Sequence, residues 1–201
     1  GSNNLNISAT DGVPMTVTGA AVLSVPAGGD YTGNTDDRIQ VLGRNLDRNG
    51  TIIATGVPYL ISEDIRVIDG AAVTIEPGVS FHMAADTELT VGWNASDAEI
   101  QAVGTQDSPI VFSGVGTTAG YWTGITIERN VKSNSKFEFV TIGHAGPSAS
   151  ANLTLRRLFD ITNSTLHDSA GYGILREGDD ATDYVTPNAF EDNALGAVGE
   201  L

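Results

Sequence analysis

The chain has 201 residues, which fits a single domain, and 40% of them are hydrophobic, which is enough for a substantial core. Its formal net charge of −15, from 25 acidic and 10 basic residues, argues against a nucleic-acid partner, because phosphate groups would be repelled. There is no cysteine, which excludes disulfides and thiolate chemistry, and no apolar run approaches the roughly 20 residues that cross a bilayer, so we expect no membrane insertion.

The first 50 residues are expected to form an N-terminal cap or the tail of a preceding segment. Residues 5–7 and 14–25 alternate like strands. Residues 28–50 are rich in Gly, Asp and Asn, and we expect them to form loops around one short strand at 39–42. A stacked β structure exposes apolar side chains and unpaired backbone groups at its ends, so some cover is expected there.

From residue 51 onwards, short strand-like segments follow one another closely. The clearest is AVTIEPGVSF at 72–81, in which apolar and polar residues alternate on both sides of the corner Pro77-Gly78. The predicted segments are 59–61, 65–68, 73–76, 79–82, 88–91, 99–103, 109–113, 124–128, 136–142, 152–155, 159–162, 165–167 and 172–175.

Three architectures contain many short strands: a sandwich, a barrel and a parallel β-helix. Strands of antiparallel sandwiches are longer and joined by hairpin turns, whereas these segments turn a corner of one or two residues and continue. The similar triplets at 73–75, 89–91 and 110–112 recur at solenoid-like intervals. The sequence therefore predicts an all-β, parallel β-helix with three faces, in which inward apolar residues stack about 4.8 Å apart.

The succession VTIEPGVSF, EIQAVGTQDSPIVFSGV, GYWTGITI and KFEFVTIGHAG resembles secreted right-handed parallel β-helix proteins of bacteria and archaea, which have a pectin-lyase-like fold. The resemblance covers about residues 57–195 and implies that the β-helix is right-handed. It also implies that Gly78, Gly104 and Gly124 lie at corners and that Trp122 packs where a rung turns. Corner and core residues specify a fold and not a function.

We therefore assign residues 1–50 to the N-terminal β/loop cap and residues 51–201 to the rungs. The chain ends soon after the rung-like PNAFEDNALGAV, without an obvious capping helix, so we expect it to be a piece of a longer protein truncated at its C-terminus. The resemblance implies an extracellular or cell-surface location, and the longer protein would supply neighbouring domains as partners.

Many proteins that resemble this fold cleave polysaccharides. The polygalacturonase-like set consists of Asn-Thr-Asp, Asp-Asp, Gly-His-Gly and Arg-Ile-Lys, in that order. Here Asn34-Thr35-Asp36 precedes the rungs, Asp179-Asp180 follows the histidine motif at 143–146, and Arg-Ile-Lys is missing. The hydrolase set is therefore not reproduced.

Lyases that resemble this fold need Ca²⁺ and a basic residue that removes the proton next to a carboxylate. Arg156, Arg157 and Asp160 are the only compact group of that kind on rung-like strands, so they are weak catalytic candidates. The alternative is a solvated corner or a salt bridge, because the two arginines interrupt the alternation of LTLRRLFDI.

The segment Asp47-Arg48-Asn49-Gly50 contains a fragment of a calcium-binding pattern, without the distal Glu of an EF-hand. Weak candidate ligands of a structural Ca²⁺ are Asp36, Asp37, Asp47 and Asn49. The alternative is an Asx-turn loop.

The three histidines, His82, His144 and His167, lie far apart in the sequence and lack HxxxH spacing. Stacked rungs could bring two of them together, but we expect solvent-facing histidines on strands.

Trp93 follows Gly92 in a loop, and an exposed aromatic ring can stack on a sugar, so Trp93 is a weak ligand-binding candidate and polysaccharide an expected partner. A full set of structural motifs without a coherent catalytic set favours a non-catalytic secreted or cell-surface module. Such a module would be a scaffold, an adhesion segment or a glycan-contacting surface within a larger protein. The alternative is a polysaccharide lyase or glycoside hydrolase that acts on acidic polysaccharide.

Overall fold

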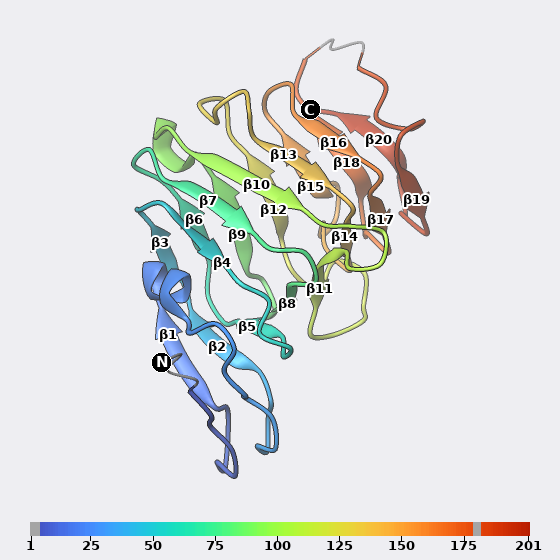
Figure 1. The fold of residues 1–201 in the computed structure, drawn as a ribbon. Coiled ribbons are helices and arrows are strands. Elements are labelled where there is room, and N and C mark those ends of the chain that lie inside the picture. Colours follow the sequence, from blue (N-terminus) through green and yellow to red (C-terminus); the bar gives the residue numbers. More distant parts are fainter. Residues whose placement is uncertain (1–4, 179–181) are drawn as a thin grey trace.

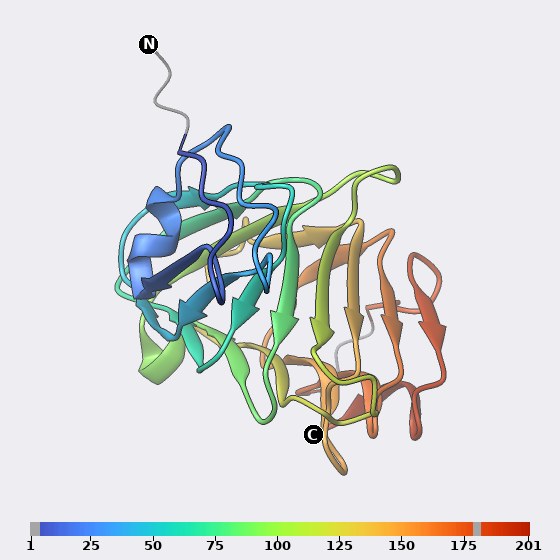
Figure 2. The same cartoon turned by 90° about the horizontal axis from the view of Figure 1, so that it is seen from below.

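The computed structural model describes residues 5–178 and 182–201. Its strands form three sheets that wind around one interior (Figure 1). The chain passes from an eight-stranded sheet to a seven-stranded sheet, then to a five-stranded sheet and back, and each strand pairs in parallel with the strand one turn away. Colours along the stack run from blue to red, so the turns follow chain order (Figure 2). The predicted all-β parallel β-helix with three faces is confirmed.

The strands are short and are divided among the three sheets in the order of their pairing. The eight-stranded sheet contains β1 (Met15–Thr18), β2 (Ile39–Leu42), β5 (Tyr59–Ile61), β8 (Ser80–Met83), β11 (Ile110–Gly114), β14 (Val140–Gly143), β17 (Thr165–His167) and β19 (Ala189–Glu191). The seven-stranded sheet contains β3 (Arg44–Leu46), β6 (Ile65–Val67), β9 (Glu88–Val91), β12 (Gly124–Ile127), β15 (Ala151–Leu155), β18 (Tyr172–Arg176) and β20 (Gly196–Glu200). The five-stranded sheet contains β4 (Gly50–Ile52), β7 (Ala72–Ile75), β10 (Glu99–Val103), β13 (Lys136–Glu138) and β16 (Asp160–Thr162).

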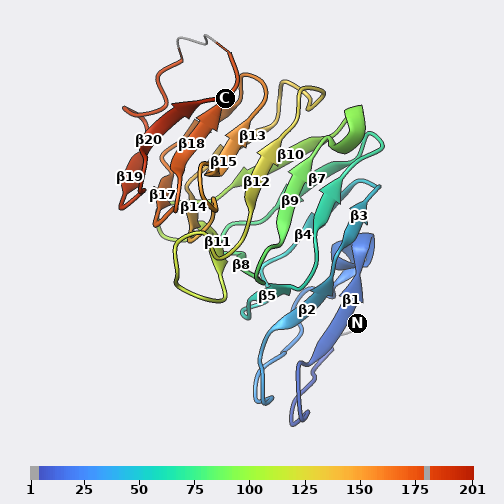
Figure 3. The same cartoon turned by 180° about the vertical axis from the view of Figure 1, so that it is seen from behind.

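A short 3₁₀-helix, η1 (Gly19–Ser24), packs against β3 and β4 at the N-terminal end of the stack (Figure 3). With β1 it lies at the N-terminal end of the stack. The expectation of loops around a single strand at 28–50 is wrong, because β3 and β4 also form there. They pair with β6 and β7, so a neighbouring turn stabilises strands that have little alternation of their own. In the part of the chain that the structure describes, no helix is long and apolar enough to cross a membrane.

The single strand predicted at 136–142 is also wrong, because the segment contains a corner. Phe139 adopts a left-handed conformation (φ 50°), and the chain leaves the five-stranded sheet after β13 and enters the eight-stranded sheet with β14. Asn163 occupies the equivalent corner one turn later (φ 52°), a geometry that asparagine tolerates. Because the corner residue is bulky and apolar, the alternating pattern alone does not show the break between β13 and β14.

The interior is filled by inward-facing rows of side chains from all three sheets. In the eight-stranded sheet, Tyr59, Phe81 and Phe112 lie in register on successive turns, and the rings of Phe81 and Phe112 stack with centroids 4.7 Å apart. Full burial of each such side chain stabilises the fold by about 1.5–3 kcal/mol. Trp122 is fully buried, as predicted, and its indole Nε1 donates a hydrogen bond to the carbonyl oxygen of Gly143 (2.8 Å).

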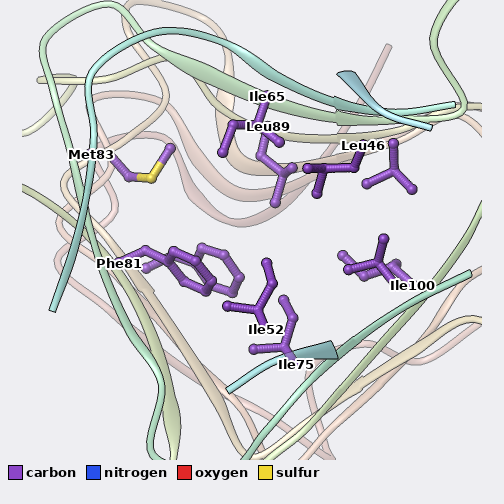
Figure 4. Close-up of a pocket in the computed structure, with 11 residues that line it drawn as sticks. Leu46, Ile52, Ile65, Ile75, Phe81, Met83, Leu89 and Ile100 are labelled. Carbon is purple, nitrogen blue, oxygen red and sulfur yellow. The ribbon is translucent and has the colours of Figure 1, made fainter. Parts of the chain in front are cut away.

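A small void lies inside the stack near its N-terminal end (Figure 4). Its volume is about 20 Å³, and every residue that lines it is apolar, including Leu46, Ile52, Phe81 and Met83. With no polar group to orient a ligand, the void is a packing defect of the core. A functional site is therefore expected on an outer face of the β-helix.

Candidate functional site

The outer face of the eight-stranded sheet carries a group of polar side chains across β11, β14 and β17. Strand alternation turns Phe112, Ile142 and Leu166 into the core, so the residues that follow them face outward. These are Ser113, Gly143 and His167, which lie in register on three successive turns.

Two further residues of this group follow the strands directly. His144 comes after β14 and Asp168 after β17, and both adopt left-handed backbone conformations (φ 64° and φ 50°). Asn, Asp and His are the non-glycine residues that occur there most often. The amide of His144 donates to the carbonyl oxygen of His167 (3.3 Å), which holds the two turns together.

The four polar side chains of this group are within reach of one another. Nδ1 of His167 lies 2.7 Å from Oδ2 of Asp168, and Nε2 of His144 lies 3.6 Å from the same oxygen. Nδ1 of His144 lies 2.9 Å from Oγ of Ser113. The imidazole rings of His144 and His167 meet edge to face, with centroids 5.3 Å apart. We call His144, His167 and Asp168, together with Ser113, the histidine cluster.

The backbone below the cluster is fixed by buried side chains. Asn152, which is fully buried, accepts from the amide of Ala145 (3.0 Å) through Oδ1 and donates to the carbonyl oxygen of His167 (2.9 Å) through Nδ2. The hydrogen bond from Trp122 holds Gly143, the residue before His144. Both histidines are thus carried by backbone that the core holds in place.

Burial and the neighbouring His167 hold the pKa of His144 below its usual value, while the charge of Asp168 acts in the opposite direction. A neutral imidazole can accept a proton or ligate a metal ion. His144 and His167 are largely buried, with side-chain exposures of 14% and 23%, whereas Asp168 is 42% exposed. The cluster is therefore a partly desolvated site that opens to solvent at its carboxylate.

The expectation of separate, solvent-facing histidines is wrong for two of the three. His144 and His167 meet because they end successive strands of one sheet, which the sequence does not reveal without the register. His82 also lies on this face, paired with Ser113 one turn earlier, but it is not part of the cluster. Within residues 5–178 and 182–201, only His144, His167 and Asp168 form a group of three His, Asp or Glu side chains close enough to share one ion.

A groove lies on the same strands, at their opposite ends. Its volume is about 540 Å³, and its lining combines polar, uncharged residues with apolar ones. The lining residues are Thr105, Gln106, Pro109, Phe139, Val140, Thr141, Asn163 and Thr165. Sequence reasoning missed this groove, because its residues come from three turns of the solenoid.

This architecture is that of a known protein family. A model of the "Pectate-lyase like beta helix domain" family matches residues 43–155, more than half of the chain. The chain belongs to this family. Among curated proteins, "Protein bark beetle" of Drosophila melanogaster is 42% identical over 64 residues, which are 32% of this chain and 2% of that protein. No solved structure matches.

In this pectate-lyase-like β-helix domain, the three catalytic candidates have separate contacts. Arg156 lies 3.3 Å from Glu128 through its Nε, and Arg157 donates to the carbonyl oxygen of Val131. Asp160 is exposed on β16, in register with Lys136. The two arginines follow β15 at the corner before β16.

Of the hydrolase-like fragments, the structure describes the one at Asn34 and the histidine motif at 143–146. Asn34 binds backbone and side-chain atoms of the cap, since its Oδ1 accepts from the amide of Thr10 (3.1 Å) and its Nδ2 donates to the carbonyl oxygen of Tyr31 (2.8 Å). Asp179-Asp180 lies outside the described residues.

The candidate calcium ligands are engaged in local contacts of this β-helix domain. Asp36 forms a two-point ion pair with Arg38, and Asp37 accepts from the amide of Asn34 (2.7 Å). Asn49 accepts from the amide of Ala72 (2.8 Å), and Asp47 lines a shallow groove beside η1. Asp36 and Asp37 precede β2, whereas Asp47 and Asn49 lie between β3 and β4, two corners further along the turn.

Trp93 lies in a second 3₁₀-helix, η2 (Trp93–Ala95), at the corner between β9 and β10. Its side chain is 43% exposed, and the guanidinium of Arg66 lies 4.4 Å from the ring centroid. The ring is thus covered on one face by a cation. This corner joins the seven- and five-stranded sheets, so Trp93 is not part of the groove or of the histidine cluster.

Proposed function

We propose that this domain is a non-catalytic module that contacts glycans through the outer face of its eight-stranded sheet. We further propose that it is displayed outside the cell or at the cell surface, as one rigid segment of a larger protein with neighbouring domains as partners. The small share of its Drosophila relative that the match covers supports a role within a longer chain.

The observation that carries this proposal is the groove across β11, β14 and β17. Hydroxyl and amide groups of Thr141, Thr165 and Asn163 face a space of about 540 Å³. Such groups pair with sugar hydroxyls, and the adjoining Phe139 and Pro109 offer apolar surface for the CH faces of a sugar ring.

Charge favours neutral glycans over acidic ones. The net charge of −15 repels polyanions at long range, and no charged side chain is among the groove residues. The rigid rungs hold the groove residues at fixed spacing before a ligand arrives, which reduces the entropy lost on binding.

Binding can be tested with the intact chain on a panel of neutral and acidic polysaccharides, by affinity electrophoresis followed by calorimetry on the best ligand. We expect binding to a neutral glycan and a loss of at least about fivefold in affinity in the double variant Thr141→Ala/Thr165→Ala, about 1 kcal/mol. The control Thr74→Ala, on the outer face of the five-stranded sheet, should bind like the unmodified protein.

Two outcomes would overturn the proposal. Absence of binding to every polysaccharide would reject the glycan-contacting role. Release of reducing or unsaturated sugar ends would reject the non-catalytic assignment and favour a lyase or hydrolase.

A further inference from the structure

The histidine cluster holds the donor atoms of a metal site. We propose that His144, His167 and Asp168 bind one divalent transition-metal ion of the Zn²⁺ class on the outer face of the eight-stranded sheet. The proposal is independent of glycan binding, because it rests on different residues at the opposite ends of the same strands.

The donor spacing fits a tetrahedral ion. One ligand atom from each of the three residues lies within 4.8 Å of the other two. Two ligands about 2.0 Å from a tetrahedral ion lie about 3.3 Å apart. The separations of 2.7 Å and 3.6 Å from Oδ2 of Asp168 to the two imidazole nitrogens lie on either side of that value.

The partner of His144 selects the nitrogen that would face the ion. If Nδ1–H donates to Oγ of Ser113, at 2.9 Å, the lone pair of Nε2 points toward Asp168. Fixing the far nitrogen of a ligating histidine in this way is a common feature of zinc sites, and it orients the ring. Ser113 is therefore a positioning residue and not a ligand.

Gly143 has no side chain, and this leaves space for the imidazole of His167. Gly143 lies between Ser113 and His167 in the outer row, and a Cβ there would lie 2.4 Å from Cε1 of His167. The His167 ring thus rests over the glycine, beside His144.

The chemical types of the three proposed ligands indicate which class of ion would bind. Imidazole nitrogens suit Zn²⁺, Cu²⁺ and Ni²⁺, whereas Ca²⁺ requires six to eight oxygen ligands. Three protein ligands leave a fourth position for water or for an oxygen of a ligand. The exposure of Asp168 gives the ion a route from solvent.

The test uses the intact, metal-stripped protein. Calorimetric titration with ZnCl₂ should give one site, while CaCl₂ should give none. At a free Zn²⁺ concentration about 100 times Kd, Tm should rise by about 5–10 °C. Co²⁺ should give the visible absorption of a tetrahedral nitrogen–oxygen site.

The variants separate this site from adventitious binding. His144→Ala, His167→Ala and the conservative Asp168→Asn should each remove the Zn²⁺-dependent rise in Tm, and Ser113→Ala should weaken affinity about tenfold. His82→Ala, in the same outer row, should keep the full response. An equal response in all variants, or none in the unmodified protein, overturns the proposal, and Asp168→Asn keeps the test valid if a histidine variant does not fold.

Discussion

The imidazole of His167 lies directly over Gly143, the residue with which it pairs on the preceding turn. A Cβ built on Gly143 would lie 2.4 Å from Cε1 and 2.5 Å from Nε2 of the ring, closer than nonbonded atoms approach. A residue without a side chain on one turn thus determines where a side chain of the next turn can lie. The relationship links strand register to the geometry of the histidine cluster.

Gly143→Ala should therefore displace the His167 ring. The ring is the outer end of a side chain that is 23% exposed and can rotate away, so we expect the unfolding free energy to fall by no more than about 1 kcal/mol, measured by urea denaturation. The control Gly12→Ala places its Cβ in open space without a positive φ, and its unfolding free energy should be unchanged or higher by up to about 1 kcal/mol. Equal effects of the two substitutions would contradict the close contact at Gly143.

Asn152→Ala should destabilise the fold strongly. The side chain is fully buried and satisfies the amide of Ala145 and the carbonyl oxygen of His167, which would both lose a partner. Unfolding free energy should fall by about 2–4 kcal/mol in chemical denaturation. Asn130→Ala, at an exposed position, should change it by no more than about 0.5 kcal/mol. A small effect of Asn152→Ala would mean that water replaces the amide.

The stacked aromatic rings of the interior predict a large cavity effect. Phe112→Ala removes a fully buried ring that stacks on Phe81, and we expect a loss of about 3–5 kcal/mol in unfolding free energy. Val111→Thr, one residue earlier and outward-facing, should cost about 0.5 kcal/mol or less. Comparable losses in calorimetric or urea unfolding would contradict the assignment of inner and outer faces on β11.

We expect the free energy of unfolding to fall as the pH falls, and His82 should account for part of the change. Burial, with the charge of Arg38, holds its pKa below the usual 6.5, against the opposite influence of Asp36. As pH falls, the unfolded chain binds the proton first. The stabilising contribution of neutral His82 is therefore present above pH 6.5 and is lost as pH falls through the folded-state pKa.

Urea unfolding at about pH 7.5 and about pH 5 measures this contribution. His82→Gln should show a smaller drop in unfolding free energy between the two values than the unmodified protein. Ser80→Ala, on the same strand and without a titrating group, should keep the full drop. An unchanged drop in His82→Gln would show that other groups account for the acid sensitivity.

Most of the architecture could be predicted from the sequence, because alternation and corners are local signals. The segments at 59–61, 88–91, 99–103 and 165–167 match strands in the structure. Strand β3, with the sequence Arg44-Asn45-Leu46, could not be predicted, because three residues with one apolar member carry no pattern. Its pairing with β6 decides its conformation.

The candidate site could be predicted far less well. The contact between His144 and His167 depends on which strands lie one turn apart, and corner lengths vary along the chain. The spacing that would have revealed the contact is visible only in the folded chain. The hydrogen bonds from Ser164 to Asn188 and from Ser169 to Asn193 join residues 24 apart, and the two histidines are separated by nearly the same interval.

Register in the eight-stranded sheet is maintained although the connecting segments differ in length. Phe81 pairs with Phe112 after a long path that includes η2, whereas Ile142 pairs with Leu166 after a shorter one. Each turn is therefore specified by its own strands and not by the contour length between them. Insertions and deletions at corners are the changes that such a chain tolerates best, so a new recognition loop can evolve or be engineered there without any rebuilding of the interior.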